Sequence, residues 1–187
     1  SNSENFTGEI SSEFNWNKII KEANDDLPEV RSVLKSSVIF SLTAFVFLKI
    51  VYLFCKIFLR LEVSGVDELK KQAKPFLICP NHQSYLDAFL VCSAYPYSVL
   101  KEIFHVGASE YFQGFLMRHL AKLLRIVPID ADTQILKAMK AGAIGLKNGK
   151  ILNIYPEGER AFDGKLHPFK KGAAILSTEL NLPIIPV

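Results

Sequence analysis

The feature of this sequence that most restricts its fold is a long uncharged apolar run. Residues 36–48 contain no charged side chain, and the apolar character continues to residue 59 past two lysines, Lys49 and Lys56. As a helix, residues 36–59 would be roughly 36 Å long at about 1.5 Å per residue, enough to cross the hydrocarbon core of a bilayer. Such a helix has to be covered by lipid or by the rest of the chain.

Three placements of this helix agree with the sequence. Lys49 and Lys56 lie seven residues apart on one helix face, from which both side chains can reach lipid head groups. A helix lying obliquely in the membrane interface therefore fits as well as a spanning helix. A buried core helix is the third placement, but the aromatic residues surround the helix and define no single stripe for a core. These aromatic residues are Phe40, Phe45, Phe47, Tyr52, Phe54 and Phe58.

After residue 60, short apolar runs alternate with longer amphipathic stretches. This alternation predicts an α/β fold with a mainly parallel sheet flanked by helices. Pro128 places the third strand at an edge or an end of the sheet. The predicted strands are residues 76–79, 103–106, 125–129 and 151–154, and the predicted helices are residues 85–94, 109–124 (with Ser109 as N-cap), 133–147 and 172–180.

The length of 187 residues suits one domain with a sizeable core. We expect residues 1–35 to be a polar leader or linker with a short helix around 16–23, residues 36–60 the membrane-spanning or interfacial helix, and residues 61–187 the α/β domain. The leader lacks the pattern of a signal peptide. Residues 181–187 read as the start of a buried strand in which the sequence stops, so we expect a piece of a longer protein with an uncovered sheet edge.

Charge and cysteine content narrow the class of protein further. The formal net charge of +3 is small, and no run of basic residues interleaves with aromatic ones, which argues against a nucleic-acid partner. Cys55, Cys79 and Cys92 are an odd number of cysteines without the spacing of metal ligands. They fit reduced, packed thiols in a domain that faces the cytosol.

The first group of residues that can carry chemistry follows the predicted strand 76–79. His82 and Asp87 would point about 140° apart on a continuous helix, but they can meet if His82 lies in the loop and Asp87 in the first helical turn. The carboxylate would then fix the imidazole tautomer and leave the other ring nitrogen free to accept a proton. The alternative is a loop histidine that only forms hydrogen bonds, with Asp87 stabilising the helix N-terminus.

The second group, Tyr155 to Arg160, follows the predicted strand 151–154. Gly158 allows a tight turn and a close approach of a ligand to the backbone. The planar guanidinium of Arg160 suits phosphate oxygens, and several lysines follow it. An ordinary charged turn is the alternative. Because the carboxyl ends of parallel strands open on one edge, a base and an anion site would face each other there.

From about Glu62 onward, the chain resembles the glycerolipid acyltransferases, a family that includes the 1-acylglycerol-3-phosphate acyltransferases. The resemblance rests on the order and spacing of four short blocks. They are Asn81-His82-x4-Asp87, Pro156-Glu157-Gly158-x-Arg160, Phe169-Lys170-Lys171-Gly172 and Ile185-Pro186-Val187.

The resemblance implies that residues 61–187 are a C-terminally truncated acyltransferase domain. A fatty acyl group would move from acyl-CoA or acyl carrier protein to a glycerolipid hydroxyl, with no covalent acyl-enzyme, no metal and no further cofactor. His82 would deprotonate the hydroxyl and Asp87 would orient His82. The partners would be membrane lipid and the thioester donor. The protein would be membrane-associated, with its active site facing the cytoplasm. The acceptor would be bound by Asn81, Glu157, Gly158, Arg160 and Lys170.

Two positions depart from the family pattern. Ala131 stands where the family usually has an arginine, and Glu159 where it commonly has threonine or serine. One cation fewer and one anion more favour a lysophospholipid with a substituted head group over lysophosphatidic acid. The same variants resemble acyltransferase halves that are fused to acyl-activating ligases, so a fused or associated ligase is a candidate partner.

Three other functions compete with acyl transfer. A hydrolase could use Ser84 or a cysteine as nucleophile, but no Gly-x-Ser-x-Gly elbow is present. A metal-dependent hydrolase could use His82, Asp87 and Glu157, although none of the four histidines pairs at ligand spacing. A non-catalytic lipid-binding membrane domain of the same fold is the third alternative.

Overall fold

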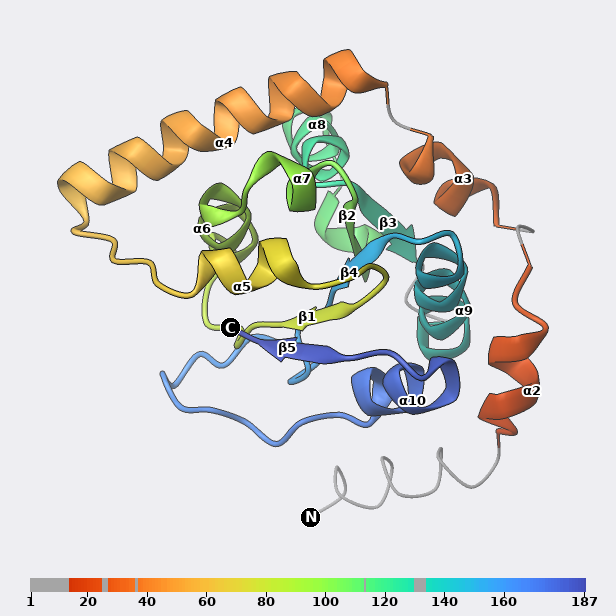
Figure 1. Cartoon of the computed structure of the whole chain (residues 1–187). Coiled ribbons are helices and arrows are strands. Elements are labelled where there is room, and N and C mark those ends of the chain that lie inside the picture. Colours follow the sequence, from red (N-terminus) through yellow and green to blue (C-terminus); the bar gives the residue numbers. More distant parts are fainter. Residues whose placement is uncertain (1–13, 25–26, 36, 113, 130–133) are drawn as a thin grey trace.

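The computed structural model describes residues 14–187 apart from residues 25–26, 36, 113 and 130–133. Its centre is a sheet of five parallel strands in the order β3-β2-β4-β1-β5 (Figure 1). The α/β prediction with a mainly parallel sheet is therefore confirmed. The strands are β1 (Leu77–Cys79), β2 (Ile103–Ala108), β3 (Ile126–Ile129), β4 (Ile151–Asn153) and β5 (Ile184–Pro186).

The two faces of the sheet carry different helices (Figure 1). Successive strand residues point to opposite faces, so Leu77 belongs to one apolar cluster and Ile78 to the other. The first face is covered by α2 (Trp16–Lys21), α3 (Pro28–Leu34), α9 (Gln134–Lys147) and α10 (Gly172–Leu180). The second is covered by α4 (Val38–Phe58), α5 (Val66–Lys71), α6 (Asp87–Ala94), α7 (Tyr97–Leu100) and α8 (Phe115–Leu123).

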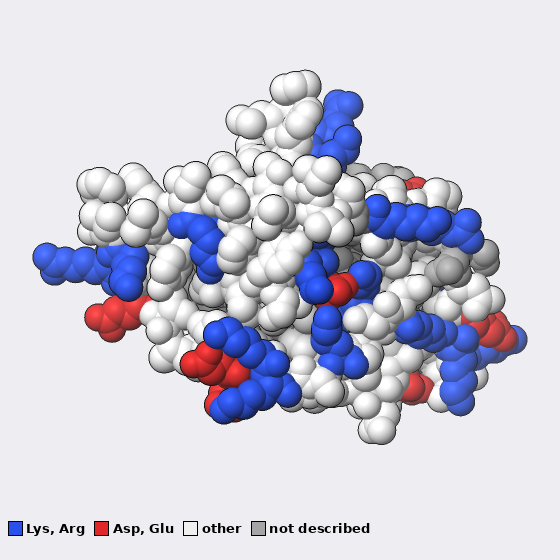
Figure 2. All heavy atoms as spheres, turned by 45° about the horizontal axis from the view of Figure 1, so that its top comes forward, with Lys and Arg blue, Asp and Glu red and all other residues white. Residues whose placement is uncertain are grey.

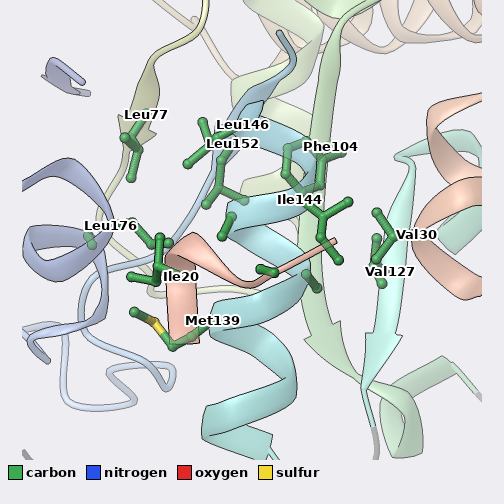
Figure 3. Packing of buried hydrophobic residues seen from close by; sticks show 14 of the residues in the cluster. Ile20, Val30, Leu77, Phe104, Val127, Met139, Ile144, Leu146, Leu152 and Leu176 are labelled. Atoms are coloured by element: carbon green, nitrogen blue, oxygen red, sulfur yellow. The ribbon is translucent and has the colours of Figure 1, made fainter. Parts of the chain in front are cut away.

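The N-terminal segment contributes to the first cluster (Figure 3). The short helix predicted around residues 16–23 is α2, and its Ile20 is fully buried, as is Val30 of α3. Lys147 fastens the end of α2, because its ammonium donates hydrogen bonds to the carbonyl groups of Lys21 (2.8 Å) and Ala23 (3.0 Å). Helices α2 and α3 thus help to close the core.

Helix α4 lies on α6 and α7 and leaves much of its apolar surface exposed (Figure 1). It buries Ser41, Ala44, Leu48 and Cys55, which excludes a helix enclosed in the core on all sides. Lys49 packs toward the domain, since its ammonium donates a 2.8 Å hydrogen bond to the carbonyl of Ser93 in α6. Figure 2 shows this side of the molecule as a largely white surface, with basic groups more prominent than acidic ones.

Two sequence predictions of the fold are wrong in part. Residues 109–124 are not one helix: a 3-10 turn, η1 (Ser109–Phe112), precedes α8. Gly114 separates them with a φ of +90°, a conformation that an α-helix cannot contain. The C-terminal strand β5 is not buried, because it is an edge strand that pairs only with β1 and leaves Ile184 39% exposed. Pro128 lies in β3, the other edge strand, as predicted.

Candidate active site

Two neighbouring strands deliver the candidate residues to one edge of the sheet. β1 and β4 pair in parallel, with Leu77 opposite Leu152 and Ile78 opposite Asn153. The loops that follow them therefore leave the sheet side by side at its carboxyl end. The loop after β1 carries His82, and the loop after β4 carries residues 155–171. The two sequence motifs are thus neighbours in space, as the parallel sheet predicted.

His82 and Asp87 meet across the start of α6. His82 lies in the loop and Asp87 is the first residue of the helix, and His82 Nδ1 is 3.0 Å from Asp87 Oδ2. With the carboxylate as acceptor, Nδ1 carries a hydrogen atom and donates a hydrogen bond to Asp87. No residue that the structure describes forms a hydrogen bond with Nε2 of His82. The imidazole therefore presents an unprotonated nitrogen whose lone pair is available to a ligand.

The carboxylate of Asp87 is itself held in place. Its Oδ2 also accepts hydrogen bonds from the backbone amides of Gln83 (2.6 Å) and Ser84 (2.7 Å). Asp87 thus holds the turn before α6 as well as the imidazole. The hydroxyl of Ser84 accepts from the amide of Leu86 (3.1 Å), and none of its described hydrogen bonds joins it to His82. Ser84 therefore supports the turn and lacks the geometry of a serine nucleophile.

The loop after β4 holds the backbone of His82 from both sides. Glu157 Oε1 accepts from the amide of His82 (2.8 Å), and the amide of Ala161 donates to the carbonyl of His82 (2.8 Å). Glu157 Oε2 accepts from the amide of His167 (3.0 Å), and the Glu157 side chain is only 1% exposed. The resemblance implied an acceptor-binding role for Glu157, whereas the structure places it as a brace between the two loops.

Tyr155 opens the second group of the sequence, but the sequence reasoning gave its side chain no role. Its ring stacks on the imidazole of His82, with 4.0 Å between the centroids and 20° between the planes. Burial raises the pKa of Tyr155, so its phenol stays protonated. Its position directly after β4, in front of the Pro156 motif, was the available signal. The ring backs the imidazole and limits its rotation.

The remaining predicted residues lie around this centre. Gly158 adopts a φ of +75°, and a Cβ there would lie 2.9 Å from Cγ of Lys170. The ammonium of Lys170 is 3.9 Å from Oε1 of Glu159, an exposed ion pair of the kind that contributes little to stability. Asn81 is exposed next to His82. The glycine thus lets the lysine stem pack against the turn, while Glu159 offsets part of the lysine's charge.

Arg160 joins the two loops through aromatic contacts. Its guanidinium carbon lies 3.2 Å from the ring centroid of Tyr85, in the His82 loop, and 4.7 Å from that of Phe162. Cation–π contacts of this kind contribute roughly 0.5–1 kcal/mol at exposed sites. Arg160 is therefore held close to the His82 loop. Ala131, the other position that departs from the family pattern, lies outside the described residues.

The cysteines do not supply a nucleophile at this site. Burial raises the pKa of Cys79 to about 11 and that of Cys92 to about 12, so both thiols stay protonated at neutral pH. Cys55 is buried in α4. Among the residues that the structure describes, no three His, Cys, Asp or Glu side chains form a group that could hold a metal ion.

The fold and the site define a class: a parallel α/β domain with a His-Asp pair of general-base geometry at the carboxyl edge of its sheet. Residues 60–187 match the model of the Acyltransferase family. Because this match covers more than half of the chain, the protein belongs to the acyltransferase family.

Several 1-acyl-sn-glycerol-3-phosphate acyltransferases are similar in sequence. The enzyme of Saccharomyces cerevisiae is 32% identical over 139 residues, which cover 71% of this chain and 44% of the yeast protein. The human beta enzyme is 33% identical over 138 residues, which cover 69% of this chain and 46% of the human protein. The chain thus spans less than half the length of these relatives.

A solved structure supports the fold. The crystal structure of the 1-acyl-sn-glycerophosphate acyltransferase PlsC from Thermotoga maritima superimposes with a TM-score of 0.51, over 84% of this chain and 55% of that one. At 21% identity, this likeness is evidence for the fold alone. The exposed helix α4, which is long and apolar enough to cross a membrane, indicates that the protein is membrane-associated.

Proposed function

We propose that the protein transfers a fatty acyl group from an acyl thioester, acyl-CoA or acyl carrier protein, to the free hydroxyl of a 1-acylglycerol-3-phosphate or lysophospholipid. The observation that carries this proposal is the His82–Asp87 pair, joined at 3.0 Å through Nδ1 while Nε2 faces no described partner. A neutral imidazole in this tautomer is a general base for a hydroxyl group. The family and the sequence relatives support the acyl group as the one transferred.

The reaction follows from this geometry. Nε2 of His82 takes the proton of the acceptor hydroxyl as its oxygen attacks the thioester carbonyl. Asp87 stabilises the imidazolium that forms. The tetrahedral intermediate collapses with cleavage of the carbon–sulfur bond, and the imidazolium returns the proton to the departing thiolate. One ester and one thiol replace one thioester and one alcohol, so His82 ends each cycle neutral and no covalent acyl-enzyme is required.

The acceptor's polar head is assigned to Asn81, Gly158, Arg160 and Lys170, around the mouth of the site. Glu157 has a different role in this proposal: it positions His82 and does not touch the acceptor, because both of its oxygens accept from backbone amides. Glu159, 3.9 Å from Lys170, weakens the hold on a doubly charged phosphomonoester. We therefore expect acceptors with a substituted head group to compete well with lysophosphatidic acid.

We further propose that α4 lies along the membrane interface and that the site faces the cytoplasm. Helix α4 packs on α6 and α7, and Ser41 near its start accepts a hydrogen bond from the buried Arg125, so a spanning helix would draw these groups into the bilayer. The free thiols of all three cysteines fit a reducing compartment. As a last element, we propose an acyl-activating ligase, fused to this chain or associated with it, as the source of the acyl thioester. If the reading frame encodes no ligase domain and no ligase copurifies with the protein, the proposal of a ligase partner is wrong.

The decisive assay incubates the protein in vesicles with radiolabelled acyl-CoA or acyl carrier protein and a panel of lysophospholipids. We expect label in a phospholipid, and a loss of about 10²–10⁴-fold in the His82→Ala variant, the usual contribution of a general base. If the wild type transfers no label to any acceptor while it still binds vesicles, the chain is a lipid-binding domain. Covalent labelling by a serine-directed acylating reagent would instead support a hydrolase.

A further inference from the structure

Six large apolar side chains lie exposed in the loops at the carboxyl edge of the sheet, around the candidate site. They come from the His82 loop, from η1 after β2, and from the loop 155–171 after β4. We call this set the apolar rim. Its members are Tyr85, Leu86, Tyr111, Phe162, Leu166 and Phe169, each between 52% and 81% exposed.

Aromatic contacts join the three loops of the rim. The Tyr85 and Tyr111 rings lie 6.2 Å apart, which connects the His82 loop to η1. Arg160 lies against both Tyr85 and Phe162, which connects the His82 loop to the loop after β4. These contacts connect Tyr85, Tyr111 and Phe162, one rim residue from each of the three loops. Isolated exposed apolar residues are common on proteins, whereas a connected group of them marks a binding surface.

The chemistry of the rim fits a lipid surface. Tyrosine rings favour the boundary between hydrocarbon and water, because they have an apolar body and a polar tip. Between residues 159 and 171 the same loop carries four basic side chains, Arg160, Lys165, Lys170 and Lys171, against two acidic ones, Glu159 and Asp163. Apolar groups that are interspersed with an excess of basic groups complement an anionic bilayer.

The rim is linked to α4 through α6. Helix α4 packs on α6, and the loop with Tyr85 and Leu86 leads directly into the first turn of α6 at Asp87. One helix, α6, therefore lies between α4 and the rim, and the His82–Asp87 pair lies at the rim end of this helix. A protein with both surfaces in the interface would hold its site at the level of the lipid head groups.

We propose that the apolar rim inserts into the interface of an anionic bilayer and brings the His82–Asp87 pair to acceptors that remain in the membrane. The delivery of acceptor rests on the proposed function, but insertion of the rim does not. The two parts are therefore tested separately, the first by a binding measurement and the second by activity.

The binding test uses Leu166→Trp, with Ile184→Trp at the amino end of β5 as the matched control. Vesicles contain phosphatidylglycerol and phosphatidylcholine with dibrominated acyl chains, which quench tryptophan in or near the hydrocarbon. We expect strong quenching for Leu166→Trp, and for Ile184→Trp no more than for the parent protein with Trp16. We also expect weaker quenching in vesicles of phosphatidylcholine alone. If the Leu166→Trp variant sediments with the vesicles but its new tryptophan is not quenched, the proposal is overturned. The rim would then be a surface for a protein partner.

The activity test compares a short-chain acceptor that is monomeric in solution with a long-chain acceptor in vesicles. Leu166→Ser/Phe169→Ser should act on a short-chain lysophospholipid, kept below its micellar concentration, within about twofold of the wild type. Its rate on a long-chain acceptor in vesicles should fall by about tenfold, since two apolar side chains that insert into the bilayer are lost. Ile184→Ser should change neither rate. Equal losses on both acceptors would contradict delivery by the rim. If the wild type acts on neither acceptor, the proposed function fails, while the quenching result still decides insertion.

Discussion

The backbone amide of His82 donates a 2.8 Å hydrogen bond to Oε1 of Glu157, a residue 75 positions further along the chain. The amide of Ala161 donates to the carbonyl of the same histidine, and the Tyr155 ring lies flat against its imidazole. The loop after β4 therefore fixes the backbone and the ring plane of His82, while Asp87 fixes its tautomer. These contacts hold the backbone, the ring plane and Nδ1 of the candidate base, and they leave Nε2 for the acceptor hydroxyl.

The buried contact predicts that Glu157 acts through position and not through acceptor binding. Glu157→Gln turns an amide nitrogen toward one of the two backbone amides, and an unsatisfied buried donor costs about 1–3 kcal/mol. We expect kcat to fall by about 10–100-fold while KM for the acceptor stays within about twofold, because a misplaced base slows only the chemical step. Steady-state kinetics with varied acceptor measures both values. The exposed Glu159→Gln is the control, and an unchanged kcat with a raised acceptor KM for Glu157→Gln would assign Glu157 to binding.

The chain contains a second His-Asp pair that serves as a control for the first. His82 pairs with Asp87 at 3.0 Å, and the more exposed His167 pairs with Asp163 at 2.9 Å. We expect Asp87→Asn to lower kcat by roughly 10³–10⁴-fold, because the tautomer of His82 is no longer fixed. Asp163→Asn should leave kcat within about twofold, since its histidine offers no proton transfer in the proposed reaction. Comparable losses in the two variants, measured with the same acyl donor, would show that neither aspartate acts through a catalytic histidine.

Glycine at position 158 is required both by backbone conformation and by space. Gly158 and Gly164 both have positive φ values, +75° and +71°, but only at Gly158 would a Cβ collide with a side chain, that of Lys170. We expect Gly164→Ala to cost about 1 kcal/mol and Gly158→Ala about 1–2 kcal/mol more, measured by denaturant unfolding. Lys170→Ala should restore most of the difference, because the colliding stem is gone. A Gly158→Ala cost that persists in full in the double variant would place the strain in the backbone alone.

Because His105 is buried, we expect the folded protein to lose stability in mild acid. Burial lowers its pKa from 6.5 to about 4, although its hydrogen bond to the carbonyl of Leu124 opposes this shift. The unfolded chain binds a proton as the pH falls below 6.5, while the folded protein does not until about pH 4. The contribution of neutral His105 to the free energy of unfolding is therefore complete above pH 6.5 and is lost as the pH falls toward 4, by about 3 kcal/mol in total.

The measurement is denaturant unfolding at pH 7.5 and pH 5 for the wild type and two variants. His105→Gln should be less stable than the wild type at pH 7.5 but should lose less stability between the two pH values. His119→Gln, at an exposed helix position, should keep the pH dependence of the wild type. An identical pH dependence in all three proteins would mean that His105 titrates normally in the fold.

The sequence by itself determined the class of fold and the first pair of site residues. Strand and helix periodicities are local, so the alternation after residue 60 sufficed to predict a parallel sheet. The five-residue spacing of His82 and Asp87 is also local, and the prediction that they meet across a loop and a first helical turn agrees with their 3.0 Å separation. The family followed from the order of four short blocks.

Only the tertiary structure decided how those residues are held and what covers them. The brace from Glu157 to His82 and the stacking of Tyr155 join loops that are distant in sequence, and no pattern along the chain records such contacts. The hydrogen bond from Lys49 to a carbonyl of α6 arises because the domain packs on that face of α4. The exposure of β5 likewise depended on which strand it pairs with. Periodicity reports local conformation, whereas burial and hydrogen-bond partners are set by the way the elements pack together.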